Sequence, residues 1–108
     1  MHPVARKTVK TFPKDVKIEF GAYVMGLQQN VEIPMHATKP MKTIAVGASE
    51  LRIKDESGIY RFFYYTKVGD YILIFHSFKK KTQKTEKREI EIAKVRLKQM
   101  LEQLKQGD

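Results

Sequence analysis

The chain has 108 residues, enough for one domain with a packed core and too few for a second. Apolar residues make up 42%, more than a disordered chain contains, and no apolar run approaches the roughly 20 residues of a membrane-spanning helix. The opening residues MHPVARKTVK lack the apolar core of a signal peptide, so we expect a cytoplasmic protein, away from membranes, whose single domain spans residues 1–108. The absence of cysteine excludes disulfides and thiolate zinc sites, and the three scattered histidines lack metal-ligand spacing. We therefore expect no metal and no cofactor.

The charge balance favours an anionic partner. Lys and Arg number 21 against 12 Asp and Glu, which gives a net charge of +9. Such an excess favours phosphate backbones or acidic protein surfaces, although a basic protein without such a partner is the simpler interpretation. The positions of the basic residues along the chain therefore matter more than their number for choosing between an anionic partner and a merely basic protein.

The first half of the chain predicts a strand, a helix and a loop. VARKTVKTF, Val4–Phe12, interleaves β-branched with basic residues and predicts an edge strand. Pro13 suits the start of a helix, and apolar residues then recur at helical spacing, so we expect a helix over Pro13–Gln29. The segment NVEIPMHATKPMKT contains two prolines and little periodicity, which predicts a loop with a short helical turn over Thr38–Thr43.

The second half predicts three strands and a final helix. Turn signals separate three runs typical of strands, which are Ser49–Lys54, Ile59–Lys67 and Tyr71–Phe78. Apolar residues from Ile90 to Leu104 then follow helical spacing, with Thr85 as N-cap and Gly107 as terminator. We predict an α+β fold with a curved, mainly antiparallel sheet, an N-terminal helical region and a C-terminal helix, and with the helices on one sheet face.

Basic residues lie on all three predicted strands or directly after them. Arg52 and Lys54 share a strand face by alternation, and Arg61 lies in the aromatic run IYRFFYYTK, where burial of a lone charge is costly. The third strand leads into HSFKKKTQKTEKR, which carries six basic residues and one acid in thirteen positions. Because neighbouring strands lie about 4.8 Å apart, these cations could converge on one concave surface.

This set of residues suits the cleavage of RNA by its own 2′-hydroxyl. Cations stabilise the charge that builds on the phosphoryl oxygens, while a crowded lysine or His76 could exchange protons. Each candidate also has a structural interpretation: a hydrogen-bonded histidine, a solvated lysine run, and an ion pair for Arg61.

The ordered motifs resemble a known family. The combination ELRIK, SGIYRFFYY and ILIFHSFKKKTQKTEKREIEIAKVR resembles the RelE/HigB superfamily of type II toxin–antitoxin toxins, in particular its phage-related HigB-like branch. That branch carries a Y-R-x-x-Y strand and an H-x-F-x-K-K-T-x-K-T segment. The resemblance implies a RelE-like fold and a ribosome-dependent, metal-independent endoribonuclease, an mRNA interferase whose RNA binding stops translation and growth.

The resemblance also implies site residues and partners. Arg61 matches the arginine that stabilises the transition-state phosphate in the family. The resemblance further implies catalytic roles for Lys54, His76 and Lys81. It implies RNA-binding roles for Arg52, Lys79, Lys80 and Lys84. RelE-type toxins often carry a tyrosine near the start of the final helix, where this chain has Thr85, Glu86 and Lys87. The implied partners are mRNA, the ribosome and a helix-turn-helix antitoxin, with operator DNA bound only through the antitoxin complex.

Two other functions compete with RNA cleavage. A ParE-like inhibitor of DNA gyrase would share the fold, but such toxins lack clustered strand cations. A non-catalytic nucleic-acid-binding module would bind DNA and RNA alike, with an affinity that falls steeply with salt. Under the cleavage hypothesis, Arg61→Ala should abolish growth inhibition and leave the fold intact.

Overall fold

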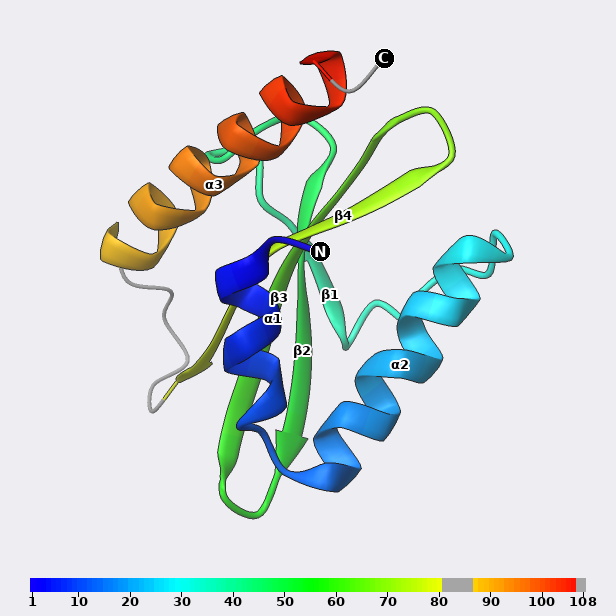
Figure 1. Ribbon diagram of the computed structural model, residues 1–108. Coiled ribbons are helices and arrows are strands. Elements are labelled where there is room, and N and C mark those ends of the chain that lie inside the picture. Colours follow the sequence, from blue (N-terminus) through cyan, green and yellow to red (C-terminus); the bar gives the residue numbers. More distant parts are fainter. Residues whose placement is uncertain (81–86, 107–108) are drawn as a thin grey trace.

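A four-stranded antiparallel sheet forms the centre of the computed structural model, which describes residues 1–80 and 87–106 (Figure 1). The strands lie in the order β1-β2-β3-β4, so each strand pairs with its neighbour in sequence. Their bounds are Thr38–Pro40 for β1, Ala48–Asp55 for β2, Gly58–Val68 for β3 and Tyr71–Lys80 for β4. The helices are α1, Pro3–Lys10; α2, Lys14–Gln28; and α3, Lys87–Gln106. The α+β fold class is therefore confirmed, and it is compatible with a RelE-like fold.

A tight turn sets the register of the β2–β3 hairpin. Asp55 Oδ1 accepts hydrogen bonds from the backbone N–H and the hydroxyl of Ser57, at 2.7 and 2.6 Å. The hydrogen bond from the Ser57 hydroxyl is the main reason why the pKa of Asp55 lies below its usual value. Gly58 closes the turn with a φ of 149°, which glycine adopts without steric cost. This register places Arg52 directly opposite Arg61.

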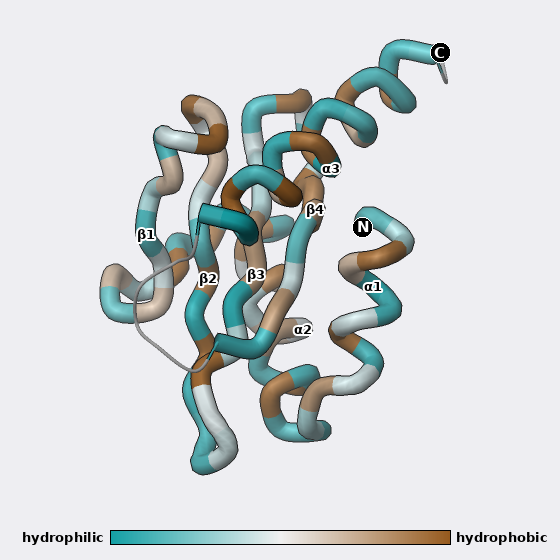
Figure 2. The backbone as a smooth tube through the Cα atoms, turned by 90° about the vertical axis from the view of Figure 1, so that its left-hand side faces the viewer, coloured by the Kyte–Doolittle hydropathy of each residue, from teal (hydrophilic) through white to brown (hydrophobic). Residues whose placement is uncertain are grey.

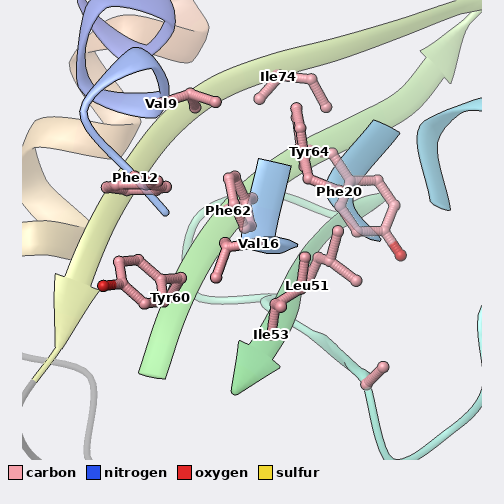
Figure 3. Packing of buried hydrophobic residues seen from close by; sticks show 11 residues of the cluster. Val9, Phe12, Val16, Phe20, Leu51, Ile53, Tyr60, Phe62, Tyr64 and Ile74 are labelled. Atoms are coloured by element: carbon pink, nitrogen blue, oxygen red, sulfur yellow. The ribbon is translucent and has the colours of Figure 1, made fainter. Parts of the chain in front are cut away.

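Two hydrophobic clusters cover opposite faces of the sheet. Phe62 and Phe63 are both fully buried, and as neighbours in one strand they point to opposite faces. On the Phe62 face, side chains of α1 and α2 pack against the sheet, and the Phe20 ring stacks on Phe62 at a centroid distance of 4.2 Å (Figure 3). On the Phe63 face, Ala93 and Leu97 of the amphipathic helix α3 complete the second cluster; the alternation of hydrophobic and hydrophilic residues along α3 is visible in Figure 2. The expectation that the helices share one face was therefore wrong.

The predicted strand over Val4–Phe12 is also wrong, because this segment contains α1. Its buried residues Ala5 and Val9 are four positions apart, which is the spacing of one helix face. His2 caps the helix, since its Nδ1 accepts a hydrogen bond from the Val4 N–H at 3.2 Å. Over so few residues, the interleaved pattern of apolar and basic residues fits the two-residue period of a strand as well as the 3.6-residue period of a helix. Contact with β4 favours the helix, in which the Ala5 carbonyl accepts a hydrogen bond from the Ser77 hydroxyl at 2.8 Å.

The predicted helical turn over Thr38–Thr43 is wrong for Thr38–Pro40, which form the short strand β1, but a turn follows directly, where the Ile44 and Ala45 N–H groups both donate to the Met41 carbonyl. Thr38 pairs with Leu51 and Pro40 with Ser49, so β1 covers only the first part of β2. Proline is tolerated here because β1 is an edge strand. The predicted helix Pro13–Gln29 and the three later strands agree with α2, β2, β3 and β4 to within two residues at each end. The predicted caps of the last helix, Thr85 and Gly107, lie outside the described residues, and no described helix is long and apolar enough to cross a membrane.

Candidate functional site

A groove of about 370 Å³ opens beside β2, beyond Thr38, the first residue of β1. Its volume is within the range of small-molecule sites, about 300–1,000 Å³. It is lined by residues of β2 and β3 together with residues of α2 and of the segment before β1. The lining residues are Glu19, Tyr23, His36, Ala37, Arg52, Lys54, Ile59 and Arg61.

The sheet wall of the groove is cationic. In the antiparallel ladder Arg52 pairs with Arg61, and Lys54 pairs with Ile59. Directly paired residues share a face, and so do residues two apart in a strand, so the three cations project from the same face. The structure thus brings together Arg52 and Lys54, which strand alternation placed on one face, and adds Arg61 through the pairing of β2 with β3.

A buried carboxylate lies beside the two arginines. Glu50 and Arg61 are each only 1% exposed, and Arg61 Nη1 lies 2.6 Å from Glu50 Oε1. Arg52 Nε lies 3.6 Å from the same oxygen, and its side chain is 33% exposed. Arg61 therefore forms the structural ion pair considered above and also lines the groove. Glu50 escaped the sequence reasoning, although its position two residues before Arg52 places it on the same strand face.

The groove is also lined by Glu19, Tyr23 and His36, none of which was predicted as a site residue. Glu19 and Tyr23 are four positions apart on α2 and so share one helix face. His36 lies in a turn closed by a hydrogen bond from the Ala37 N–H to the Pro34 carbonyl at 2.9 Å. The helical spacing of Glu19 and Tyr23 could be found in the sequence, but their place in the groove lining depends on tertiary packing.

His76 has a structural environment away from the groove. It is 4% exposed, its Nε2 lies 2.8 Å from Glu89 Oε2, and its Nδ1 lies 2.6 Å from Arg96 Nη1. Because arginine can only donate, Nδ1 accepts this hydrogen bond and the Nε2–H donates to Glu89. Burial lowers the pKa of His76, although Glu89 opposes the shift. The neutral ring thus connects β4 to α3, and this geometry favours the structural interpretation of His76 over the catalytic one.

The lysine run does not join the groove as one cluster. Lys80 pairs with Ile59 and so lies on the same sheet face as Arg61, but it is 4% exposed and does not line the groove. Lys79 pairs with Tyr60 and points to the other face, where its Nζ lies 5.6 Å from the centre of the Tyr60 ring. Lys81 and Lys84 lie outside the described residues.

The groove is suited to bind and polarise a phosphodiester. Arg52 and Lys54 line it, and the buried ion pair of Arg61 with Glu50 holds the neighbouring strand positions before a ligand arrives. Preorganised cations of this kind stabilise developing negative charge on phosphoryl oxygens. Within residues 1–80 and 87–106, no three His, Asp or Glu side chains are grouped to hold a metal ion.

Comparison with known proteins gives one family. The model of the phage-derived protein Gp49-like family (DUF891) matches residues 7–98, which include every residue that lines the groove. No curated protein matches the chain. Because the family model covers most of the 108 residues, the chain belongs to the Gp49-like family of phage-derived proteins, which is associated with toxins of toxin–antitoxin systems.

Proposed function

We propose that the protein is the toxin of a type II toxin–antitoxin system and that it inhibits growth by cleaving mRNA. The observation that carries this proposal is the convergence of Arg52, Lys54 and Arg61 on one groove of nucleotide-accommodating size. Membership of a toxin-associated family supports the biological role.

The proposed reaction is a transfer within the RNA itself. The 2′-oxygen attacks the adjacent phosphorus, the bond to the 5′-oxygen breaks, and a 2′,3′-cyclic phosphate remains. Negative charge builds on the non-bridging oxygens, where Arg52 and Lys54 would donate hydrogen bonds. Removal of one such donor typically costs about 10²–10³ in rate. DNA lacks the 2′-hydroxyl, so the mechanism requires RNA.

Arg61 would act differently from its two neighbours. Its burial and its ion pair with Glu50 mean that it contributes positive charge from beneath the groove and keeps the sheet wall in place. Its loss should therefore affect the fold as well as the chemistry. Arg52 and Lys54, which are more exposed, are the better residues with which to test function.

The proposed partners follow from this role. An antitoxin would restrain the protein, and a helix-turn-helix antitoxin would bring the complex to operator DNA. mRNA in the ribosomal decoding site is the proposed substrate, because translation would then present an extended single strand to the groove. A reading frame for a helix-turn-helix protein beside the gene would support the pairing.

The test compares two double variants that lose equal charge. Arg52→Ala with Lys54→Ala removes two groove cations, whereas Lys7→Ala with Lys10→Ala removes two exposed cations of α1. Each protein is induced in a bacterial host, growth is followed, and mRNA ends are mapped by primer extension. We expect new mRNA ends and growth arrest with the wild type and the α1 variant, and loss of both with the groove variant. Growth arrest with an SOS response and intact mRNA would overturn the proposal in favour of gyrase inhibition.

A further inference from the structure

A second groove, of about 380 Å³, lies between α3 and the segment that connects β1 to β2. Its apolar lining residues are Ile44, Ala45, Leu97 and Leu101, and most of its charged lining residues are lysines. We infer that this groove, which we call the α3 groove, is the docking surface for an acidic amphipathic helix of the antitoxin, a partner whose identity rests on the proposed function.

The apolar part of the α3 groove belongs to the second hydrophobic cluster. Leu97 is 4% exposed, and the half-buried residues Ile44, Ala45 and Leu101 pack against the same cluster. The connecting segment is held in a turn, because the Ile44 and Ala45 N–H groups donate to the Met41 carbonyl at 3.0 and 3.3 Å. The groove is thus formed in the free chain, and a partner side chain that enters it removes more apolar surface from water.

The apolar residues of α3 in this groove lie in a stripe along the helix. Leu97 and Leu101 are four positions apart, and Leu104, which is half-buried, continues the stripe three positions later. At 1.5 Å per residue, the stripe is about 10 Å long, or roughly two helical turns. The last turns of α3 extend beyond the strands, which leaves a second helix access along them (Figure 2). Apolar side chains at positions i, i+4 and i+7 of a partner helix match a stripe of this length.

The charged residues of the α3 groove favour an acidic partner. Lys94, Lys98 and Lys105 line it against one acid, Glu102, and all four residues are exposed. Lys94 Nζ lies 3.8 Å from Glu91 Oε1 in the same helix. Within residues 1–80 and 87–106, neither Lys98 nor Lys105 forms an ion pair, so both are available to carboxylates of a partner. Opposite charges around an apolar contact speed association and fix its register.

RNA and a second copy of the chain fit the α3 groove less well. Proteins that hold single-stranded RNA stack its bases on aromatic side chains, and no aromatic residue of the described chain lines this groove. A second copy would have to supply an acidic helix. In the described part of the chain, α1 and α3 carry more basic than acidic residues, and α2 carries equal numbers.

The two grooves lie at different ends of β2 and can be tested separately. The N–H of Ala48, the first residue of β2, donates to the Ala45 carbonyl at 3.1 Å, which places the α3 groove beside the start of the strand. Lys54 lies six residues later, about 20 Å along an extended strand. Substitutions of α3 side chains therefore leave the cations of the first groove in place.

The first experiment measures how the protein encoded by the neighbouring reading frame binds this chain, by isothermal titration calorimetry. Lys98→Glu with Lys105→Glu reverses two charges of the α3 groove, and the matched control Lys7→Glu with Lys10→Glu reverses two exposed charges of α1. We expect the groove variant to bind at least about tenfold more weakly and the α1 variant to stay within about twofold of the wild type, because like charges at a contact repel.

The second experiment tests the apolar contact. Leu101→Ala should weaken binding about fivefold or more, whereas Ile18→Ala, at a site 60% exposed on α2, should leave the affinity unchanged. Thermal unfolding of the free variants shows whether each is folded. Hydrogen–deuterium exchange of the wild type needs no substitution: the bound antitoxin should protect backbone amides of residues 41–47 and 94–105.

The outcomes separate this docking surface from the proposed function. If the neighbouring protein neither binds the chain nor restores growth, the toxin–antitoxin proposal is refuted and the docking surface with it. Tight binding that the groove variants leave unchanged, with protection elsewhere on the chain, would refute the docking surface alone. Equal weakening by the α1 control would also refute it, as would self-association or RNA binding that only the groove variant loses while antitoxin binding persists.

Discussion

Removal of Arg61 should destabilise the protein through the carboxylate that it leaves behind. Glu50 is 1% exposed and lies 2.6 Å from the Arg61 guanidinium, so Arg61→Ala leaves a buried charge without its nearest partner. Breaking a buried pair in this way costs about 3–5 kcal/mol. Arg52 Nε remains 3.6 Å from the same oxygen, which favours the lower end of that range. The sequence-based expectation that Arg61→Ala leaves the fold intact therefore needs correction.

The magnitude is large relative to the stability of a domain of this size. Total stabilities are about 5–15 kcal/mol, so a loss of about 3 kcal/mol removes a substantial part of the free energy of unfolding. Each kcal/mol shifts the midpoint of thermal unfolding by about 4–8 °C in small domains, which predicts a decrease of at least about 12 °C. Urea unfolding followed by circular dichroism measures the free energy directly, and an unchanged m-value would show that the transition stays two-state.

A double variant separates ion-pair loss from cavity formation. Arg61→Met with Glu50→Leu replaces both charges by apolar side chains, and such replacements of buried pairs are often neutral or stabilising. We expect the double variant to be more stable than Arg61→Ala by about 2 kcal/mol or more. If Arg61→Ala unfolds at the wild-type midpoint, or if the double variant is the less stable of the two, the buried ion pair does not have the energetic role assigned to it.

Three further predictions concern other parts of the molecule. The lowered pKa of His76 means that the unfolded state binds more protons below about pH 6.5, so the free energy of unfolding should fall as the pH decreases from there, and His76→Gln should flatten this dependence in urea titrations between pH 7.5 and 5.5. Phe20→Ala removes the ring stacked on Phe62 and should cost about 3–5 kcal/mol in urea unfolding, whereas Ile18→Ala at a site 60% exposed should stay within about 0.5 kcal/mol; equal costs would contradict the described packing of α2. Lys54→Ala should reduce the slope of log affinity against log salt by about 0.7 for single-stranded RNA. Lys79→Ala, on the other sheet face, should change this slope less. A larger change with Lys79→Ala than with Lys54→Ala in filter-binding assays would show that RNA binds the Lys79 face instead.

Local periodicity explains why parts of the fold were predictable. Helical spacing identified α2 and α3, and alternation with turn signals identified β2, β3 and β4, because these patterns report which side of each element is buried. The segment of α1 is too short for its pattern to separate the two periods, and β1 has three residues, too few for any pattern. Contacts with β4 and β2 determine the structure of these two segments.

The sequence by itself determined the cationic wall, because alternation and short turns place Arg52, Lys54 and Arg61 on one face of adjacent strands. Only the tertiary structure decided which other residues line the groove with these cations. Because β1 begins only at Thr38, opposite Leu51, the later part of β2 lies beside the segment that carries His36, and Glu19, far away in the chain, lines the same groove. The same holds for His76, whose burial against Glu89 and Arg96 depends on how α3 packs on the sheet. The periodicity of apolar residues shows which face of a single helix or strand is buried. A site formed by several elements depends on how those elements pack together, and no local sequence pattern encodes that packing.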